Sequence, residues 1–398
     1  MPTQSSLTTF FVARGLRGFG DGFAVIILPA YLAALDYSLA AIGAIATLAL
    51  FGSAATTLTV GLLGRRYDLR NLLIAGGLLM AATGLLVASS GHIAVIVFAV
   101  MVGTLTPSAG ETGLMIPLEH ASIAQSVEHR NRTAIFARYS LIGTLSTAAG
   151  ALAAGLPDLL TDESSALPDA LRSMFILYAL LGLAAAFLYF RLPSLRPVEA
   201  PAPTALGPSR GIVVKLAVLF SLDSFAGGFT VQSLLALWLF VQFDLSLASA
   251  SLFFFCSSLL SASSFLFAST LARRIGLINT MVFTHIPSNL CIIAAAFAPN
   301  LTVALTLLLI RSTLSQMDIP VRSSYVMAVV TPAERPAAAS FTAAPRTLAA
   351  ALSPALAGIM MASAFPAMPL LISGVLKIAY DIAVLYTFRH VKPPEEVP

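Results

Sequence analysis

The chain has 398 residues, of which 58% are hydrophobic and only 10% are charged, and its formal net charge is +4. About a quarter of the residues of an ordinary soluble domain are charged, so this composition excludes a water-soluble globular protein and indicates that lipid is the main solvent. The Lys and Arg residues stand in small groups between apolar stretches and form no basic stripe, so we expect no nucleic-acid partner.

Apolar stretches long enough to cross a bilayer recur along the chain, since about 20 apolar residues in a helix span the hydrocarbon. We therefore expect an all-α membrane protein with twelve transmembrane helices. The predicted spans are residues 9–35, 39–63, 72–90, 93–121, 134–156, 173–190, 212–240, 246–271, 276–297, 301–328, 337–362 and 367–388.

The region between the sixth and seventh predicted spans is too polar and too rich in proline for a membrane helix. Its prolines are Pro193, Pro197, Pro201, Pro203 and Pro208. We predict an N-terminal six-helix bundle at 1–191, a cytoplasmic linker at 192–211 and a C-terminal six-helix bundle at 212–398.

The placement of Lys and Arg predicts the orientation, because short loops rich in these residues stay on the cytoplasmic side. One alternate set of connections holds fourteen of the 22, namely Arg65, Arg66, Arg70, Arg130, Arg132, Arg191, Arg196, Arg210, Lys215, Arg273, Arg274, Arg335, Arg389 and Lys392. The opposite set contains only Arg172. We expect a multi-pass protein of the inner cell membrane, with both termini cytoplasmic.

The two halves of the chain repeat each other at an offset of about 202 to 208 residues. The corresponding segments are Gly20–Ala24 with Leu222–Ala226, Arg65–Arg66 with Arg273–Arg274, and Ile116–Leu118 with Ile319–Val321. Six spans followed by the same six in one orientation form the parallel repeat of an alternating-access transporter.

The segment after the second predicted span, Gly61 to Leu73, reads GLLGRRYDLRNLL. It is similar to the signature loop of the major facilitator superfamily, which the chain resembles over essentially its whole length. Arg65 stands where the family carries an acidic residue, and Asp68 lies close enough to substitute. The resemblance implies two six-helix bundles around a central cavity and a conformational lock. The lock candidates are Gly61, Arg66, Asp68 and Arg70.

The fifth predicted span carries small residues at the spacing of this family's proton-coupled exporter motif, although the motif's proline is missing. These residues are Ser146, Gly150, Ala151, Ala154 and Gly155. Small residues at this spacing also let two helices approach closely, so packing alone explains them equally well.

Four carboxylates within predicted spans are candidate site residues, because an ionisable side chain there is costly and normally faces a cavity or a partner. They are Asp21, Glu111, Asp223 and Asp318, on the first, fourth, seventh and tenth spans. The resemblance implies that these four helices line the central cavity. Each carboxylate is a candidate for proton coupling, and a helix cap or a fixed ion pair is the structural alternative.

The tenth predicted span also contains two arginines, and the spacings of Arg311, Asp318 and Arg322 place all three on broadly one helical face. This face predicts either an anion site with a titrating aspartate or a neutralised structural ladder. Elsewhere, we expect Arg17 to pair with Asp21, Lys377 to neutralise Asp381, and Glu119 to be solvated.

We predict a secondary transporter that moves a small molecule by alternating access, with protons as the coupling ion and export as the direction. A proton-coupled importer of an organic anion and a transporter-like sensor that moves nothing are the alternatives. We expect a monomer with no enzymatic activity, no catalytic residue, no cofactor and no metal, because no phosphate loop or metal-ligand pattern occurs.

Overall fold

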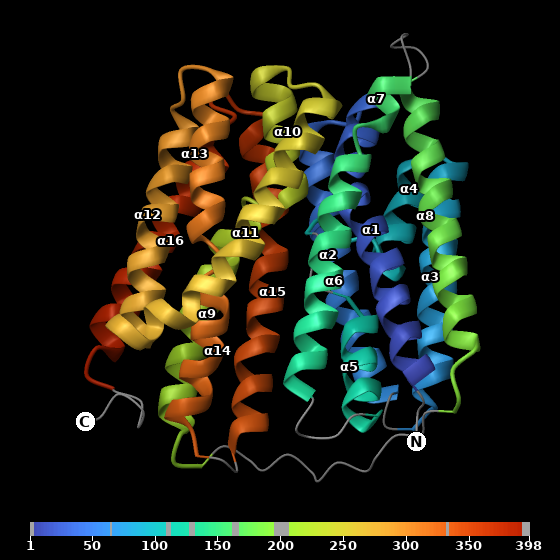
Figure 1. Ribbon diagram of the computed structural model, residues 1–398. Coiled ribbons are helices and arrows are strands. Elements are labelled where there is room, and N and C mark those ends of the chain that lie inside the picture. The colour runs from blue at the N-terminus through green and yellow to red at the C-terminus, as the bar shows by residue number, and fades with distance from the viewer. Residues whose placement is uncertain are drawn as a thin grey trace. The chain divides into compact units, whose positions relative to one another are not determined.

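The structure is a computed structural model, and it describes residues 4–63, 66–108, 113–126, 132–160, 167–194, 207–331 and 334–391. Within these ranges the regular secondary structure is entirely helical (Figure 1). The helices are α1 (Gln4–Ala34), α2 (Leu39–Leu63), α3 (Leu69–Ser89), α4 (Ile93–Val102), α5 (Met115–Ser126), α6 (Arg132–Ala153), α7 (Leu156–Leu160), α8 (Leu167–Phe190), α9 (Arg210–Gly228), α10 (Gln232–Phe243), α11 (Leu247–Ile275), α12 (Leu277–Ala296), α13 (Leu301–Leu314), α14 (Asp318–Val329), α15 (Arg335–Met361) and α16 (Met368–Phe388).

The chain divides into two compact units. The first comprises Met1–Ala200 and Gln232–Phe255, and the second comprises Pro201–Val231 and Cys256–Pro398. In the first unit α3 packs along α8, and in the second α12 packs along α16 (Figure 1). The first unit includes α10, because Gln232–Phe255 belongs to it, and α10 packs against α1. The bundle boundaries given by the sequence repeat stay a prediction.

Nine helical stretches in the described part of the chain are long and apolar enough to cross a membrane. The predicted spans outside these nine also coincide with described helices. The fourth and tenth are each divided into two shorter helices, and the eleventh corresponds to α15, which contains Arg346 and two internal prolines. Each of the twelve predicted spans therefore has helical counterparts, although not every span is one continuous helix.

The fourth predicted span is interrupted between α4 and α5. Gly103 ends α4, and a side chain there would meet the Thr83 hydroxyl and the Ala99 carbonyl. Pro107 lacks the N–H that a helix interior requires, and Gly113 has a φ of +135° that a side chain would disfavour. The prediction of an unbroken helix over 93–121 is therefore wrong, and non-helical backbone lies within this span.

The tenth predicted span is interrupted as well, because α13 ends at Leu314 and α14 begins at Asp318. Arg311 therefore lies on a different helix from Asp318 and Arg322. The expectation that all three share one helical face is wrong, although the four-residue spacing of Asp318 and Arg322 does produce an ion pair of 2.9 Å.

Helices α1 and α6 approach each other closely because glycines line their contact. A side chain at Gly22 would meet the Thr147 carbonyl oxygen, and one at Gly150 would meet the Phe19 carbonyl oxygen. A side chain at Gly143 would meet the Arg14 guanidinium. The small residues of the fifth predicted span thus serve close helix packing.

The turn before α15 is held by Glu334. Its carboxylate accepts hydrogen bonds from the hydroxyls of Ser209 and Thr331, each at 2.6 Å, and from the Gly207 backbone N–H at 2.5 Å. These bonds lower the pKa of the Glu334 carboxyl from 4.5 to about 2, with the Ser209 hydrogen bond as the largest cause. Glu334 therefore fixes the start of α9 to the turn between α14 and α15.

Replacing Glu334 by Gln is expected to lower the melting temperature of the purified protein by a few degrees at pH 7. A carboxyl whose pKa is lower in the folded than in the unfolded protein stabilises the fold fully at pH values above its ordinary pKa of 4.5. This contribution is lost as the pH falls toward the folded pKa of about 2. The difference between wild type and E334Q in a thermal unfolding series should therefore shrink below about pH 5. A difference that is constant with pH would contradict the role of the carboxylate charge.

Candidate functional site

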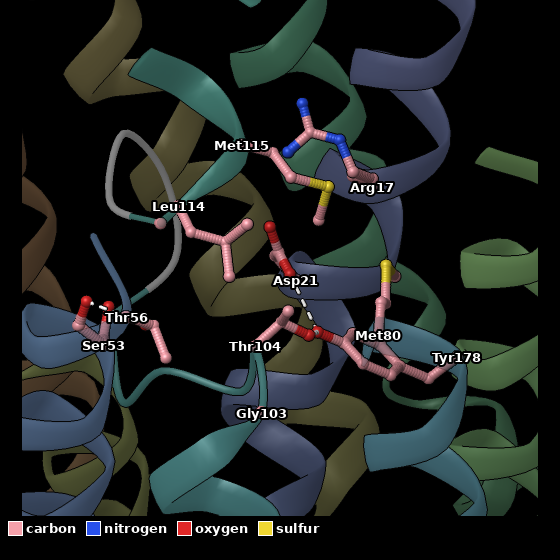
Figure 2. A pocket seen from close by; sticks show the side chains of 11 residues that line it. Arg17, Asp21, Ser53, Thr56, Met80, Gly103, Thr104, Leu114, Met115 and Tyr178 are labelled. Atoms are coloured by element: carbon pink, nitrogen blue, oxygen red, sulfur yellow. Dashed lines mark hydrogen bonds between the residues drawn. The ribbon is translucent and has the colours of Figure 1, made fainter. Parts of the chain in front are cut away.

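The first unit contains a small cavity of about 20 Å³ beside Asp21, which is room for about one water molecule. Figure 2 shows the Asp21 carboxylate at its centre, with the side chains of Leu114 and Met115 beside it. The Tyr178 hydroxyl donates to the Asp21 Oδ1 at 3.3 Å and lies 2.8 Å from the Thr104 hydroxyl. Residues of α1, α2, α3, α5 and α8, together with non-helical residues that follow α4 and precede α5, thus meet around Asp21.

Asp21 has no ion-pair partner among the residues that the structure describes. Arg17 precedes it by one helical turn and lines the same cavity, but its guanidinium binds Glu119 instead. The sequence-based expectation that Arg17 pairs with Asp21 is therefore wrong. A carboxylate in a low-dielectric site without a paired cation is less costly when it holds a proton.

Glu119 is the centre of a buried polar cluster. Its carboxylate binds the Arg17 guanidinium and accepts hydrogen bonds from the Tyr139 hydroxyl and, at 2.7 Å, from the Tyr189 hydroxyl. Glu119 has no exposed surface, so the expectation that it is solvated is wrong. Sequence position near a helix end suggested exposure, whereas α1, α6 and α8 cover this face of α5.

The second unit contains a larger cluster of buried charges around Asp223. The Lys377 ammonium lies 2.6 Å from its Oδ1, and the Arg322 guanidinium lies 2.9 Å from its Oδ2. Arg322 also forms the ion pair with Asp318, so one guanidinium joins two carboxylates. The structure thus brings three of the predicted site residues, Asp223, Asp318 and Arg322, into one network.

His285 on α12 extends this network to a second residue of α16, Asp381. Its Nδ1 lies 2.8 Å from the Asp381 carboxylate, and its Nε2 lies 4.0 Å from Asp223. Asp381 also accepts a hydrogen bond of 3.1 Å from Asn289. The expected pairing of Lys377 with Asp381 is wrong, because Lys377 is directed to α9 and Asp381 to α12.

The two units use equivalent positions of the sequence repeat differently. Asp21 and Asp223 correspond in the repeat, and Tyr178 and Tyr380 are separated by the same 202 residues. Tyr178 donates to Asp21. In contrast, Asp223 is held by two cations, and the buried Tyr380 hydroxyl has no hydrogen-bond partner among the described residues.

The loop between α2 and α3 contains the predicted conformational lock. Asp68 caps α3 by accepting from the Arg70 backbone N–H at 2.9 Å, and it accepts from the Ser194 hydroxyl at 2.5 Å. The Arg70 guanidinium donates to the Phe190 carbonyl oxygen at 2.6 Å. These contacts fasten the start of α3 to the end of α8, whereas Arg66 is exposed and Gly61 lies in the last turn of α2.

Three further residues were singled out from the sequence, namely Arg65, Glu111 and Arg311. Glu111 and Arg65 lie outside the described residues. Arg311 is described and lies on α13, apart from the Asp223 network in its contacts.

Comparison with known proteins identifies the class to which this arrangement belongs. The family model of the Major Facilitator Superfamily matches residues 10–317. The chain belongs to this family, and it is therefore a multi-pass membrane transporter of small molecules rather than an enzyme. The all-α fold class of twelve transmembrane helices in two bundles, predicted from the sequence, is confirmed.

Individual relatives agree with this assignment. The chain is 23% identical to the Saccharomyces cerevisiae uncharacterized membrane protein YJR124C, over 94% of this chain and 92% of that protein. Its fold is similar to that of a D-xylose-proton symporter, with a TM-score of 0.77, 16% identity and coverage of 95% and 96% of the two chains. It is also similar to the nucleoside transporter NupG, with a TM-score of 0.75, 14% identity and coverage of 97% and 99%.

Proposed function

We propose that this transporter is coupled to protons and that Asp21 is the group that takes up and releases the proton. The observation that carries the proposal is the position of Asp21 on a cavity, without a paired cation among the described residues. A coupling carboxylate must alternate between neutral and ionised forms, and a fixed ion pair would hold it ionised.

The other two described candidates, Asp223 and Asp318, are less suited to this role. Asp223 is held by Lys377 and Arg322, and Asp318 is held by Arg322. Protonating either carboxylate would remove a negative charge from a cluster that holds two buried cations, which is costly in hydrocarbon. Asp21 carries no such restriction. The similarity in fold to a D-xylose-proton symporter is consistent with coupling to protons.

The proposed direction is export, which rests on the sequence alone. Of the small residues that suggested an exporter motif, Ser146, Gly150 and Ala151 lie in the contact between α1 and α6, and Gly155 packs against α11. Packing therefore accounts for these residues. Location in an inner membrane with cytoplasmic termini likewise rests on the distribution of Lys and Arg.

Replacing Asp21 by Asn is expected to abolish substrate-driven proton movement while leaving some substrate exchange. The measurement uses proteoliposomes that contain a pH-sensitive dye, to which sugars, nucleosides and organic acids are added in turn. A compound that changes the internal pH with wild type is then supplied in labelled form to measure counterflow. The D21N variant should lose the pH response by tenfold or more and retain counterflow.

The matched control is Asp36→Asn, which changes an aspartate in the turn that follows the same helix. This variant should behave as wild type. Undiminished proton movement in D21N would overturn the proposal. Absence of counterflow for every compound with wild type would instead favour the sensor alternative.

A further inference from the structure

Arg311 is an unpaired cation within a predicted span. No ion pair and no hydrogen bond of its guanidinium occurs among the described residues, and its Nε is buried. By contrast, Arg17, Arg322 and Lys377 each bind a carboxylate. An arginine at this depth is costly without a counter-charge, and such residues normally mark a substrate or ion pathway.

Hydroxyl and thiol side chains lie near Arg311, and no acid among the described residues forms an ion pair with it. The Ser288 hydroxyl approaches the Arg311 backbone oxygen at 3.5 Å, which places α12 against α13 at this level. Cys291, which follows Ser288 on α12, lies close enough to interact electrostatically with the guanidinium. Ser312, the next residue on α13, has its hydroxyl 2.7 Å from the Ser257 hydroxyl. The Ser288 and Ser312 hydroxyls donate to backbone oxygens, so the Arg311 guanidinium is the donor group here that lacks an acceptor among the described residues.

We propose that Arg311 binds the carboxylate of a small organic anion, so that the substrate itself supplies the missing counter-charge. This inference rests on the proposed transport function and adds a substrate class to it. The planar guanidinium presents a fork of N–H donors that matches a carboxylate through two parallel hydrogen bonds.

We expect the substrate to carry a single negative charge. Among the described residues, no second cation lies beside the Arg311 guanidinium to neutralise another. A phosphate dianion would need a second cation for neutrality, whereas a monocarboxylate is neutralised by one guanidinium. Arg322, the other arginine on the tenth predicted span, is already neutralised by two aspartates.

Ligand-dependent stability provides the first test. Purified wild-type protein should gain thermal stability with benzoate or acetate, but not with the neutral isostere benzamide or with inorganic phosphate. Arg311→Met should lose this gain and should melt above wild type without ligand, because it removes an unpaired charge that is partly buried. Arg311→Lys, which keeps the charge, should retain a reduced gain.

The native cysteine Cys291 provides the second test, which needs no knowledge of the natural substrate. The test uses two methanethiosulfonate reagents, one with an anionic sulfonate group and one with a cationic ammonium group. In a Cys256→Ser background, the anionic reagent should modify Cys291 faster than the cationic one. Each rate is first divided by the rate of the same reagent with a free thiol. Arg311→Gln should lower this preference by about tenfold, because the attracting charge is lost. Benzoate should slow the modification of Cys291 in the protein that contains Arg311, and it should not slow this reaction in R311Q.

Several results would overturn the proposal. In the stability test, these results are a melting temperature of R311M below that of wild type, equal effects of benzoate and benzamide, and stabilisation by phosphate alone or by none of the four compounds. In the cysteine test, the contradicting result is a preference for the anionic reagent at Cys291 that R311Q does not change. None of these measurements depends on Asp21. A failure here therefore leaves proton coupling standing, and a failure of the D21N experiment leaves the anion site standing.

Discussion

Replacing Asp223 by Asn is expected to destabilise the protein by about 3 to 5 kcal/mol, because it leaves the buried Lys377 without a carboxylate. Arg322 keeps one acidic partner in Asp318, so the stranded ammonium dominates the loss. The measurement is unfolding of the purified variant, followed by helical circular dichroism during a thermal or denaturant series.

The double variant D223N/K377M separates an ion-pair effect from a general packing effect. Methionine has nearly the length of lysine and no charge, so the double variant should recover most of the lost stability. Asp169→Asn is the exposed control, since its ion pair with Arg172 lies at the surface and is worth about 0 to 1 kcal/mol. If D223N and the double variant have the same stability against unfolding, the stranded charge of Lys377 is not the cause of the loss.

Replacing Glu119 by Gln is expected to have the second large effect, because it strands the buried Arg17 guanidinium at a cost of about 3 kcal/mol. The carboxylate closest in sequence to Arg17 is then Asp21, one helical turn away. A cation that turns toward Asp21 favours the ionised form of that carboxylate. Proton-coupled transport in E119Q should therefore require a lower external pH than in wild type.

Infrared difference spectroscopy can follow this effect without a substrate. The protonated-carboxyl band that disappears in D21N identifies Asp21, and the pH at half-height of that band should fall in E119Q. Tyr139→Phe is the matched control, because it removes one hydrogen bond to Glu119 and keeps the ion pair. An Asp21 band at the same pH in wild type and E119Q would show that Glu119 has only a structural role.

Contacts between residues close in sequence formed as the local sequence predicts. Asp68 precedes Leu69 at the start of α3 and caps it, as an aspartate before a helical apolar run should. Asp318 and Arg322 form the ion pair that their four-residue spacing predicts. Both features depend on neighbours a few residues apart, and such contacts are fixed once the helix is fixed.

Partners from distant helices were predicted poorly. Glu119 meets Arg17, Tyr139 and Tyr189 although these residues are separated from it by between 20 and 102 positions. Lys377 reaches Asp223 across 154 positions and leaves its own-helix neighbour Asp381 to His285. Spacing within one helix cannot reveal which neighbouring helix presents the complementary charge.

The sequence by itself determined that this protein lies in a membrane, where its spans fall and to which family it belongs. These properties follow from the length and polarity of each segment, because lipid requires about 20 apolar residues for every crossing whatever the neighbours are. Only the tertiary structure decided which charges are neutralised. The packing of the helices within each unit leaves Asp21 and Arg311 without paired charges among the described residues. It also encloses Glu119 with Arg17, and Asp223 with Lys377 and Arg322.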